Sequence, residues 1–572
     1  MIRLLKYARN YRKQVVLGPF FKFLEALFEL FLPLLMAKLI DDGIRQNDWE
    51  LVRKMTLLMI LTSIIGLAFA SICQYFSSFA SQGFGTELRN QLMKKINSFS
   101  HQELNDFGTD TLITRMTNDI NQLQLALAML IRLVVRAPFL SIGAVVMSFS
   151  IDRQIGLIFL IILPLFCLIL FAIVKSSVPL YKKVQTYLDR INEIVSQNLS
   201  GVRVIRAFSR RKTEIKRFDE STDLLSRVYI RVSNISALLN PMTTFILNMG
   251  ILAILLLGGI KVNLGSLQQG QILALVNYMN QMLLSLIIIS NLVVIFTRAA
   301  ASAERINQLL DTQVEIKDAQ QTQLPQSRQG QIEFRQVDFR FSADFGLALK
   351  HIDFTIKGGQ MIGITGATGS GKTALTQLIP RFYDSSQGSV LVDGINVSDW
   401  PLKDLRQTIG IVPQTAVLFT GTIRENLQWG KKEASDKECW YALKLAQAED
   451  FVAALPQKLD TAINEGGKNL SGGQRQRLTI ARALIKKPEI LILDDSLSAL
   501  DYQTDYDLRQ ALKEIPATVL IISQRIRSIQ DADQILVMDS GELVAYGKHD
   551  KLLQASKQYQ EIFASQEEGA DV

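Results

Sequence analysis

The residues best suited to chemistry form the stretch Gly366–Thr373, which fits the pattern G-x-x-x-x-G-K-[ST]. In this pattern the glycines let backbone N–H groups close around phosphate oxygens, and the lysine reaches the β- and γ-phosphates of a nucleotide. The threonine hydroxyl is suited to ligate Mg²⁺. The stretch therefore predicts a site for ATP and Mg²⁺, formed by Gly366, Ala367, Thr368, Gly369, Ser370, Gly371, Lys372 and Thr373.

The flanking sequence supplies the elements that must position such a loop. The apolar run 361–364 predicts a short buried strand before it, and residues 374–379 open a helix after it. A loop between a strand and a helix N-terminus presents N–H groups where anions are favoured. Because the pattern alone also arises by chance, this order of strand, loop and helix is what favours a phosphate-binding loop.

Two further positions could complete the site. The apolar run 489–493 predicts a strand ending at Asp494, a rigid place from which a carboxylate can hold Mg²⁺ against the phosphates. Gln414 follows another predicted strand and could reach Mg²⁺ or the attacking water.

A second glycine-rich turn also opens a helix. It consists of Leu470, Ser471, Gly472, Gly473 and Gln474. A Gly-Gly pair at a helix N-terminus is again an arrangement that binds phosphate. A second phosphate site in one small domain is redundant unless it serves the nucleotide of another molecule.

Composition separates the chain into two parts. Hydrophobic residues make up 48% of the 572 residues, mean hydropathy is +0.18, and the long uncharged runs lie before about residue 300. A spanning helix needs roughly 20 apolar residues. We therefore expect six spans, at about 15–40, 55–80, 123–149, 155–174, 235–260 and 272–297. The net charge of +8 then indicates a basic cytoplasmic face and no nucleic-acid partner.

Two long polar stretches, 81–120 and 175–232, carry heptad-like apolar spacing and many basic residues. We expect them to form helices that extend beyond the bilayer on the cytoplasmic side. Residues 318–328 are polar and rich in Gln, which predicts a linker. The expected domains are 1–310 in the membrane, 311–330 as linker and 331–565 around the nucleotide.

Charges inside the first span leave two interpretations open. Lys22, Glu25 and Glu29 recur on one helical face, and a charge buried in a span costs roughly 2.5–3.5 kcal/mol on insertion scales. In the first interpretation, these side chains form ion pairs with one another or with charged residues of neighbouring helices. Alternatively, Glu25 or Glu29 lines a cavity that accepts cationic or amphipathic substrates.

The order of the motifs resembles that of the ABC transporter nucleotide-binding domain, over essentially all of residues 330–565. The resemblance implies that Gly366–Thr373 is the Walker A loop and that Asp494 is the Walker B aspartate. It also implies that Gln414 is the Q-loop glutamine and that Phe341 stacks on adenine.

The same resemblance implies that Leu470–Gln474 is the signature motif and that Asp501 belongs to the D-loop. The preceding part is similar to the transmembrane domain of type IV ABC exporters, and residues 109–119 and 201–208 resemble its two coupling segments. The implied fold is an α-helical membrane domain with six spans, followed by an α/β P-loop ATPase domain. One domain of each kind makes a half-transporter.

Two positions depart from the family pattern. Asp495 stands where the family has a catalytic glutamate, and Gln524 stands where it has the switch histidine. Aspartate is one methylene shorter than glutamate, so the carboxylate of Asp495 lies farther from the reacting centre. A misplacement of about 1 Å there can cost about 10²-fold in rate. Gln524 can hydrogen-bond to a γ-phosphate but cannot carry the charge of a histidine. We therefore expect the chain's own site to be slow or degenerate.

The resemblance then implies a heterodimer, in which a second, non-identical half-transporter supplies the glutamate and the histidine. The signature of this chain would complete the partner's site. The expected function is ATP-driven efflux of small amphipathic drugs across a bacterial cell membrane, in contact with membrane lipid and with the nucleotide-binding domain in the cytoplasm. A homodimeric exporter of lipid or peptide that hydrolyses ATP at both sites is the alternative, and an ATP-gated channel or regulator is a less favoured one.

Overall fold

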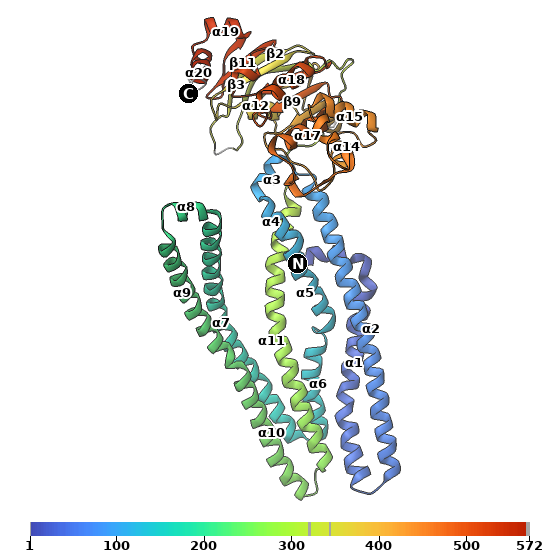
Figure 1. The fold of residues 1–572 in the computed structure, drawn as a ribbon. Helices are drawn as coiled ribbons and strands as arrows, with labels where there is room; N and C mark the ends of the chain where they lie inside the picture. The colour runs from blue at the N-terminus through green and yellow to red at the C-terminus, as the bar shows by residue number, and fades with distance from the viewer. Residues whose placement is uncertain (1, 319–321, 343–344, 568–572) are drawn as a thin grey trace. The chain divides into compact units, whose positions relative to one another are not determined.

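The computed structural model describes residues 2–318, 322–342 and 345–567 and divides into two compact units (Figure 1). The first unit is Met1–Asn97 with Asp110–Thr312, and the second is Ser98–Thr109 with Gln313–Val572. In the described ranges the first unit is helical, and every strand belongs to the second. A short segment from the first third of the chain is therefore part of the second unit.

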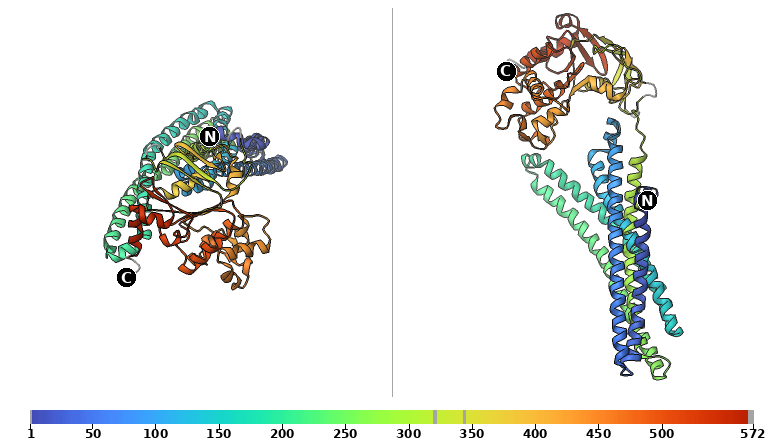
Figure 2. Two further views of the ribbon diagram at one scale, coloured as in Figure 1. Left: turned by 90° about the horizontal axis from the view of Figure 1, so that it is seen from above. Right: turned by 90° about the vertical axis from the view of Figure 1, so that its right-hand side faces the viewer.

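Long helices make up the first unit, and Figure 2 shows them from two further sides. They are η1 (Ile2–Tyr11), α1 (Arg12–Lys38), η2 (Leu39–Ile44), α2 (Trp49–Ile96), α4 (Thr109–Thr114), η3 (Arg115–Asp119), α5 (Ile120–Arg132), α6 (Arg136–Ile151), α7 (Arg153–Ser200), α8 (Val202–Ala207), α9 (Arg211–Ala237), α10 (Leu239–Asn263) and α11 (Gln269–Asp311).

Acidic side chains fix where two of these helices begin. Asp152 accepts hydrogen bonds from two N–H groups in the first turn of α7, at 2.9 and 3.0 Å. The buried Asp41 accepts from the N–H groups of Gly270 and Gln271 in α11, at 2.7 and 3.1 Å. These caps satisfy N–H groups that have no partner within their own helix.

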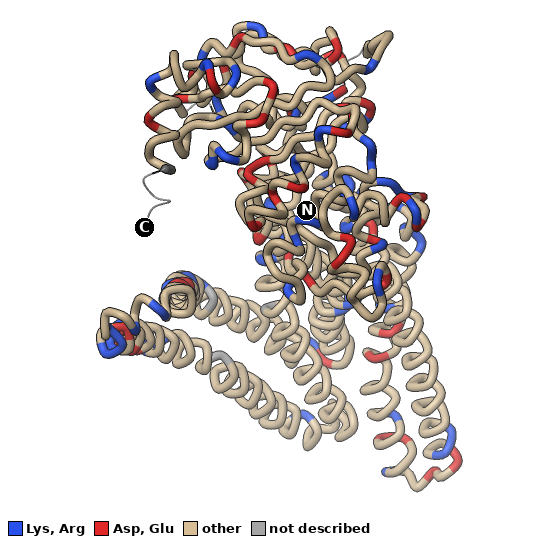
Figure 3. Tube along the Cα trace, turned by 45° about the horizontal axis from the view of Figure 1, so that its top comes forward, with Lys and Arg blue, Asp and Glu red and all other residues tan. Residues whose placement is uncertain are grey.

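Five helical segments in the described part are long and apolar enough to cross a membrane. They are Trp49–Ile96, Thr109–Ile151, Arg153–Ser200, Arg211–Asn263 and Gln269–Asp311. Figure 3 shows how sparse charged residues are along the middle of these helices. The expected first span falls on α1, which is helical but carries charges at Lys22, Glu25 and Glu29. The structure therefore supports five of the six expected spans on composition, and the sixth stays a prediction.

The helical continuation of two expected spans into the polar stretches is confirmed, and the position of these extensions on the cytoplasmic side stays a prediction. α2 continues as one helix to Ile96, and α7 continues to Ser200. Residues Ser98–Thr109, which directly precede most of the predicted first coupling segment at 109–119, belong to the second unit, and the coupling role of 109–119 stays a prediction. The stretch Ser98–Thr109 contains α3 (His101–Phe107), which begins at a capping box formed by Ser100 and Glu103.

Two larger sheets build the second unit. One is antiparallel, in the order β2-β1-β4-β5, and the other is six-stranded, in the order β12-β11-β3-β10-β9-β6. A small third sheet pairs β7 with β8. The strands are β1 (Ile332–Phe339), β2 (Leu349–Ile356), β3 (Met361–Gly366), β4 (Gln387–Val392), β5 (Ile395–Asn396), β6 (Ile409–Val412), β7 (Gly421–Thr422), β8 (Ala462–Ile463), β9 (Ile490–Asp494), β10 (Thr518–Ile522), β11 (Gln534–Asp539) and β12 (Glu542–Gly547).

Helices complete the second unit. They are α12 (Lys372–Leu378), α13 (Leu402–Thr408), α14 (Ile423–Gln428), α15 (Asp436–Leu445), α16 (Glu449–Ala453), η4 (Lys458–Asp460), η5 (Glu465–Gly467), α17 (Gly472–Leu484), α18 (Tyr502–Lys513), η6 (Ile526–Ser528), α19 (His549–Ala555) and α20 (Lys557–Glu567).

Parallel pairing in the six-stranded sheet explains where the chemistry lies. β10 pairs in parallel with β3 on one side and with β9 on the other, so that Ile522 is opposite both Ile364 and Asp494. All six residues of β3 are buried, as expected for a strand read from a continuous apolar run. The carboxyl ends of parallel strands meet at one edge of a sheet, where ligands bind in α/β folds.

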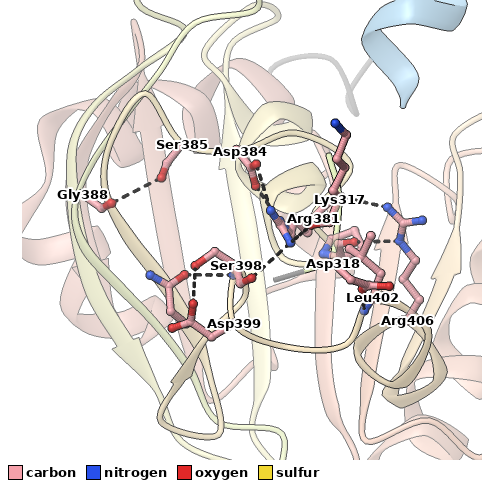
Figure 4. Close-up of polar contacts among 12 residues, drawn as sticks. Lys317, Asp318, Arg381, Asp384, Ser385, Gly388, Ser398, Asp399, Leu402 and Arg406 are labelled. Atoms are coloured by element: carbon pink, nitrogen blue, oxygen red, sulfur yellow. Dashed lines mark hydrogen bonds and ion pairs between the residues drawn. The ribbon is translucent and has the colours of Figure 1, made fainter. Parts of the chain in front are cut away.

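The expected linker is fastened to the second unit where it is described. Asp318 accepts a hydrogen bond from the N–H of Leu402 at 2.8 Å, and the carbonyl of Lys317 accepts one from Arg381 at 3.1 Å (Figure 4). Residues 319–321 of the expected linker lie outside the described residues.

Candidate functional site

The loop between β3 and α12 has a backbone that requires glycine. Gly366 has φ of +146°, and a Cβ there would lie 2.1 Å from the carbonyl oxygen of Met538. Gly371 has φ of +98°, in the left-handed region. Lys372 folds back over this loop and donates to the carbonyls of Gly366 and Ala367 at 2.8 and 2.7 Å. Burial lowers the pKa of Lys372, although the nearby carboxylates oppose that shift.

A pocket of about 290 Å³ opens beside this loop and gathers most of the predicted site. Its walls come from five of the predicted motifs, four of which follow parallel strands of the six-stranded sheet, while Phe341 follows β1 of the antiparallel sheet. It is lined by Phe341, Ala348, Thr368, Gly369, Gly371, Lys372, Thr373, Ala374, Gln414, Asp494, Asp495, Ile522 and Gln524. The arrangement is suited to a nucleotide that lies with its phosphates over the loop.

The residues at the phosphate end fit a magnesium ion. The Thr373 hydroxyl donates to Asp494 Oδ1 at 3.2 Å, and Gln414 lines the same wall. Hydroxyl, carboxylate and amide oxygens are ligands that Mg²⁺ accepts, and Mg²⁺ takes few of them from protein when phosphates supply the rest. No cluster of three or more His, Cys, Asp or Glu that could hold a metal occurs in the described ranges. Burial raises the pKa of Asp494, despite the hydrogen bond from Thr373.

Asp495 and Gln524, the two departures, lie in this same pocket. Asp495 has φ of +46°, which a non-glycine residue adopts only at a cost. Its N–H donates to the carbonyl of Ile522 at 3.0 Å, and its carboxylate accepts a hydrogen bond from Gln414 at 3.2 Å. Gln524 follows β10 and is exposed.

Phe341 also lines the pocket and is 41% exposed. Its ring meets that of Tyr383 edge-on, with 5.3 Å between centroids. The Tyr383 hydroxyl accepts a hydrogen bond from Asn105 of α3 at 3.3 Å. Sequence reasoning missed Tyr383 because a lone tyrosine after a helix carries no pattern.

The signature and D-loop residues lie outside this pocket. Ser471 caps α17 in a capping box with Gln474, in which Ser471 N–H donates to Gln474 at 2.9 Å. Ser471 and Gly472 are exposed. Asp501 caps α18 by accepting from the N–H of Thr504 at 3.0 Å. Their action on another chain's nucleotide stays a prediction.

Both acidic residues proposed for a substrate cavity are paired in the structure. Glu25 accepts from Lys22 at 2.6 and 2.8 Å, and Glu29 accepts from Arg136 at 2.8 and 3.0 Å. Charge pairing, the first of the two interpretations, is therefore present. A role for Glu25 or Glu29 toward substrates stays a prediction.

A helical membrane domain joined to a P-loop domain with this pocket defines an ATP-driven membrane translocase. Residues 15–286 match the family described as ABC transporter transmembrane region, and residues 349–498 match the family described as ABC transporter. The chain belongs to the ABC transporter family.

Relatives match over nearly the whole length. The chain is 39% identical to the uncharacterized ABC transporter ATP-binding protein YfiB of Bacillus subtilis (strain 168), over 95% of this chain and 94% of that protein. It is 31% identical to an ATP-dependent lipid A-core flippase of Syntrophus aciditrophicus (strain SB), over 98% and 93%. The solved structure of a bacterial Atm1-family ABC exporter with ATP bound has the same fold, with a TM-score of 0.81 at 24% identity, covering 97% of this chain and 98% of that one.

The chain therefore carries the transmembrane region and the ATP-binding domain of an ABC transporter in one polypeptide, and it has the fold of the exporter structure. It is an ATP-hydrolysing translocase that uses ATP with Mg²⁺. It spans the membrane, with the ATPase domain in the cytoplasm. Exporters of this family work as dimers.

Proposed function

We propose that this chain is the degenerate-site half of a heterodimeric exporter that moves small amphipathic compounds, drugs among them, out of a bacterial cell. Its own site binds ATP and hydrolyses it slowly, while its signature completes the active site of a non-identical partner. The observation that carries the proposal is the presence of Asp495 and Gln524 together in one otherwise intact ATP pocket.

Geometry supports a slow site. A carboxylate that activates water must lie within hydrogen-bond reach of it. Asp495 is one methylene shorter than glutamate, and its carboxylate is held by Gln414 at 3.2 Å. Retreat by about 1 Å can cost about 10²-fold in rate. Gln524 adds no positive charge beside the γ-phosphate, where a histidine could.

The exposed signature supports a partner. Ser471 and Gly472 present a helix N-terminus away from their own pocket, as a second phosphate site for another nucleotide requires. Two identical copies would give two weak sites. A partner with glutamate and histidine at these positions would form one strong site opposite this signature. Around α8, Val204 and Phe208 are 60% and 73% exposed and offer apolar surface to the other half.

We also take α1 as the sixth span. Its 27 residues extend about 40 Å, more than the roughly 30 Å of a hydrocarbon core. The pairs Lys22–Glu25 and Glu29–Arg136 neutralise its charges, which lowers the cost of placing them in the membrane.

The proposed mechanism is alternating access. The loop N–H groups and Lys372 bind the phosphates, and Mg²⁺ held by Thr373 and Asp494 would neutralise phosphate charge. Closure of the two ATPase domains moves α3, which docks on this domain through Asn105 and Tyr383. The spans then turn the cavity outward, and hydrolysis at the partner's site resets it.

ATPase activity of the purified chain, alone and mixed with its partner, tests the proposal. The chain alone should be nearly silent and the pair active. Asp495→Glu should raise the rate of the pair only modestly, whereas Ser471→Ala should abolish most of it while leaving ATP binding to this chain intact. If the chain alone turns over ATP at the rate of the pair, the degenerate-site proposal is wrong.

A homodimeric lipid exporter is the second candidate, because one relative is named a lipid A-core flippase. It requires the chain alone to hydrolyse ATP vigorously and to move lipid in vesicles. The substrate class has its own test. Replacing Glu25 and Glu29 by Gln should reduce transport of cationic compounds more than ATP binding. Equal losses for neutral and cationic compounds would refute a cavity role for these carboxylates.

A further inference from the structure

The loop that carries Gln524 is held on one side by the central sheet. Ser523, the residue before it, donates its N–H to the carbonyl of Ile364 in β3 at 3.1 Å. The N–H of Arg525, the residue after it, donates to the Ser523 hydroxyl at 3.0 Å. These bonds fix the start of the loop to the strand that leads into the phosphate-binding loop.

The other side of this loop is held by one side chain, that of Gln566 in the last helix, α20. Gln566 Nε2 donates to the carbonyl of Gln524 at 2.6 Å, and Gln566 Oε1 accepts from the N–H of Ile526 at 2.9 Å. One amide therefore satisfies a backbone acceptor and a backbone donor on either side of Arg525. A side chain that bonds both fixes the local backbone more firmly than either bond alone.

Gln566 is itself held in place by the anchoring of α20. Tyr559 is completely buried and hydrogen-bonds to His549 at 2.7 Å, and Phe563 packs against the ring of the same histidine. Tyr559, Phe563 and Gln566 are spaced four and three residues apart, so they share one face of the helix. The buried face of α20 thus aims Gln566 at the loop.

The loop has little packing around it near the Gln566 amide, so the two hydrogen bonds of this amide matter more for the position of the loop. A hollow of about 520 Å³ lies beside it, lined by Tyr502, Asp505, Gln524, Arg525, Arg527, Ser528 and Gln566. Packing is therefore thin on that side. Gln524 also lines the ATP pocket, together with Lys372 and Asp495.

We infer that Gln566 is a positioning residue, which aims Gln524 at the terminal phosphate of ATP by clamping the backbone on both sides of Arg525. Gln566 does not line the ATP pocket and acts through Gln524. Because only ATP has a γ-phosphate, loss of the clamp should weaken ATP binding and leave ADP binding unchanged. The inference concerns this chain's own site and holds for a heterodimer or a homodimer.

The test compares equilibrium binding of MgAMP-PNP, which is not hydrolysed, and MgADP to the full-length chain in nanodiscs. Gln566→Ala should lower the preference for the triphosphate roughly five-fold, the equivalent of about one hydrogen bond, with MgADP affinity within about two-fold of the wild type. Gln560→Ala is the matched control, because Gln560 lies on the same helix and donates to the Leu553 carbonyl at 2.6 Å, away from the loop.

A second variant and a double mutant keep the inference open to refutation. Gln566→Glu retains the acceptor for the Ile526 N–H but cannot donate to Gln524. Gln566→Glu should therefore lose the preference for the triphosphate but keep slow amide exchange at Ile526. Gln566→Ala should accelerate that exchange. In a Gln524→Ala background, Gln566→Ala should have no further effect on the preference.

Three outcomes would overturn the inference. The preference could be unchanged in both Gln566 variants, or MgADP and MgAMP-PNP affinities could fall equally, which would make Gln566 a structural residue only. An undiminished effect of Gln566→Ala in the Gln524→Ala background would show that it does not act through Gln524.

Discussion

Arg381 joins the linker to the ATPase domain and is the most informative side chain to remove. It is 7% exposed and lies just beyond α12 (Figure 4). Its guanidinium donates to the carbonyls of Lys317 and Ser398 at 3.1 and 3.2 Å and to the carboxylate of Asp384 at 2.7 and 3.2 Å. One planar group thereby binds the linker, the turn before α13 and its own turn, which lysine cannot do with the same geometry.

The loss of stability expected on removing the Arg381 side chain follows from these contacts. Hydrogen bonds from a charged donor contribute about 1.5–3 kcal/mol each, and breaking a buried ion pair costs about 3–5 kcal/mol. We therefore expect Arg381→Ala to lower the free energy of unfolding of the ATPase domain by about 3–5 kcal/mol. For a domain of this size the melting temperature should fall by roughly 6–20 °C. The melting temperature of Arg381→Lys should lie between those of Arg381→Ala and the wild type.

Intrinsic tryptophan fluorescence on heating measures this loss. Three of the four tryptophans lie in the ATPase domain, and Trp400, which is fully buried, directly follows the turn that Arg381 holds. Arg335→Ala is the control, because Arg335 makes an ion pair with Glu333 on the exposed surface, where such pairs contribute little. A melting temperature for Arg381→Ala within about 2 °C of the Arg335→Ala variant would refute the reasoning.

Two further predictions concern the phosphate loop and the docked helix. Gly366→Ala should abolish ATP binding in equilibrium measurements, since its Cβ would lie 2.1 Å from the Met538 carbonyl oxygen. Gly369→Ala should weaken binding less, since its φ of +82° strains a side chain but its Cβ would have nothing within 4 Å. Burial, and then the charge of Arg406, lowers the pKa of His101 below its ordinary value of 6.5. Because undocked α3 then binds more protons, docking should be fully stable above about pH 6.5 and weaken as the pH falls through the lowered pKa. Amide exchange in α3 should show this loss of protection between about pH 7.5 and about pH 5.5, and His101→Leu should remove the pH dependence.

The sequence predicted best what depends on local pattern. The buried strands at 361–366 and 490–494 are continuous apolar runs, because both faces of a parallel sheet are covered. Parallel strands also align their carboxyl ends, so Asp494 could be placed beside the phosphate loop without knowledge of the fold. The continuation of α2 and α7 as long helices was predicted from heptad-like spacing.

Contacts between distant segments could not be predicted in the same way. Asn105 meets Tyr383 across 278 positions, and Gln566 meets Gln524 across 42. A single amide or phenol has no period and no motif, so nothing in the sequence marks it. The short helix α3, which belongs to the second unit although it lies far from it in sequence, was not predicted for the same reason.

The structure also bears on why the ATP pocket would be kept in a slow site. Asp495 holds a left-handed backbone, with φ of +46°, and Gly366 holds a φ of +146° that alanine could not follow. Strained conformations persist only where the surroundings impose them. In the proposed slow site these conformations lie beside Asp495 and Gln524, which would alter the chemistry of hydrolysis and could still form hydrogen bonds. In the proposed slow site only the side chains at 495 and 524, which handle protons, would differ from the family pattern. Such a pocket would be suited to bind ATP for long periods. In the proposed dimer, that bound ATP would keep the two ATPase domains together while the partner's site turns over.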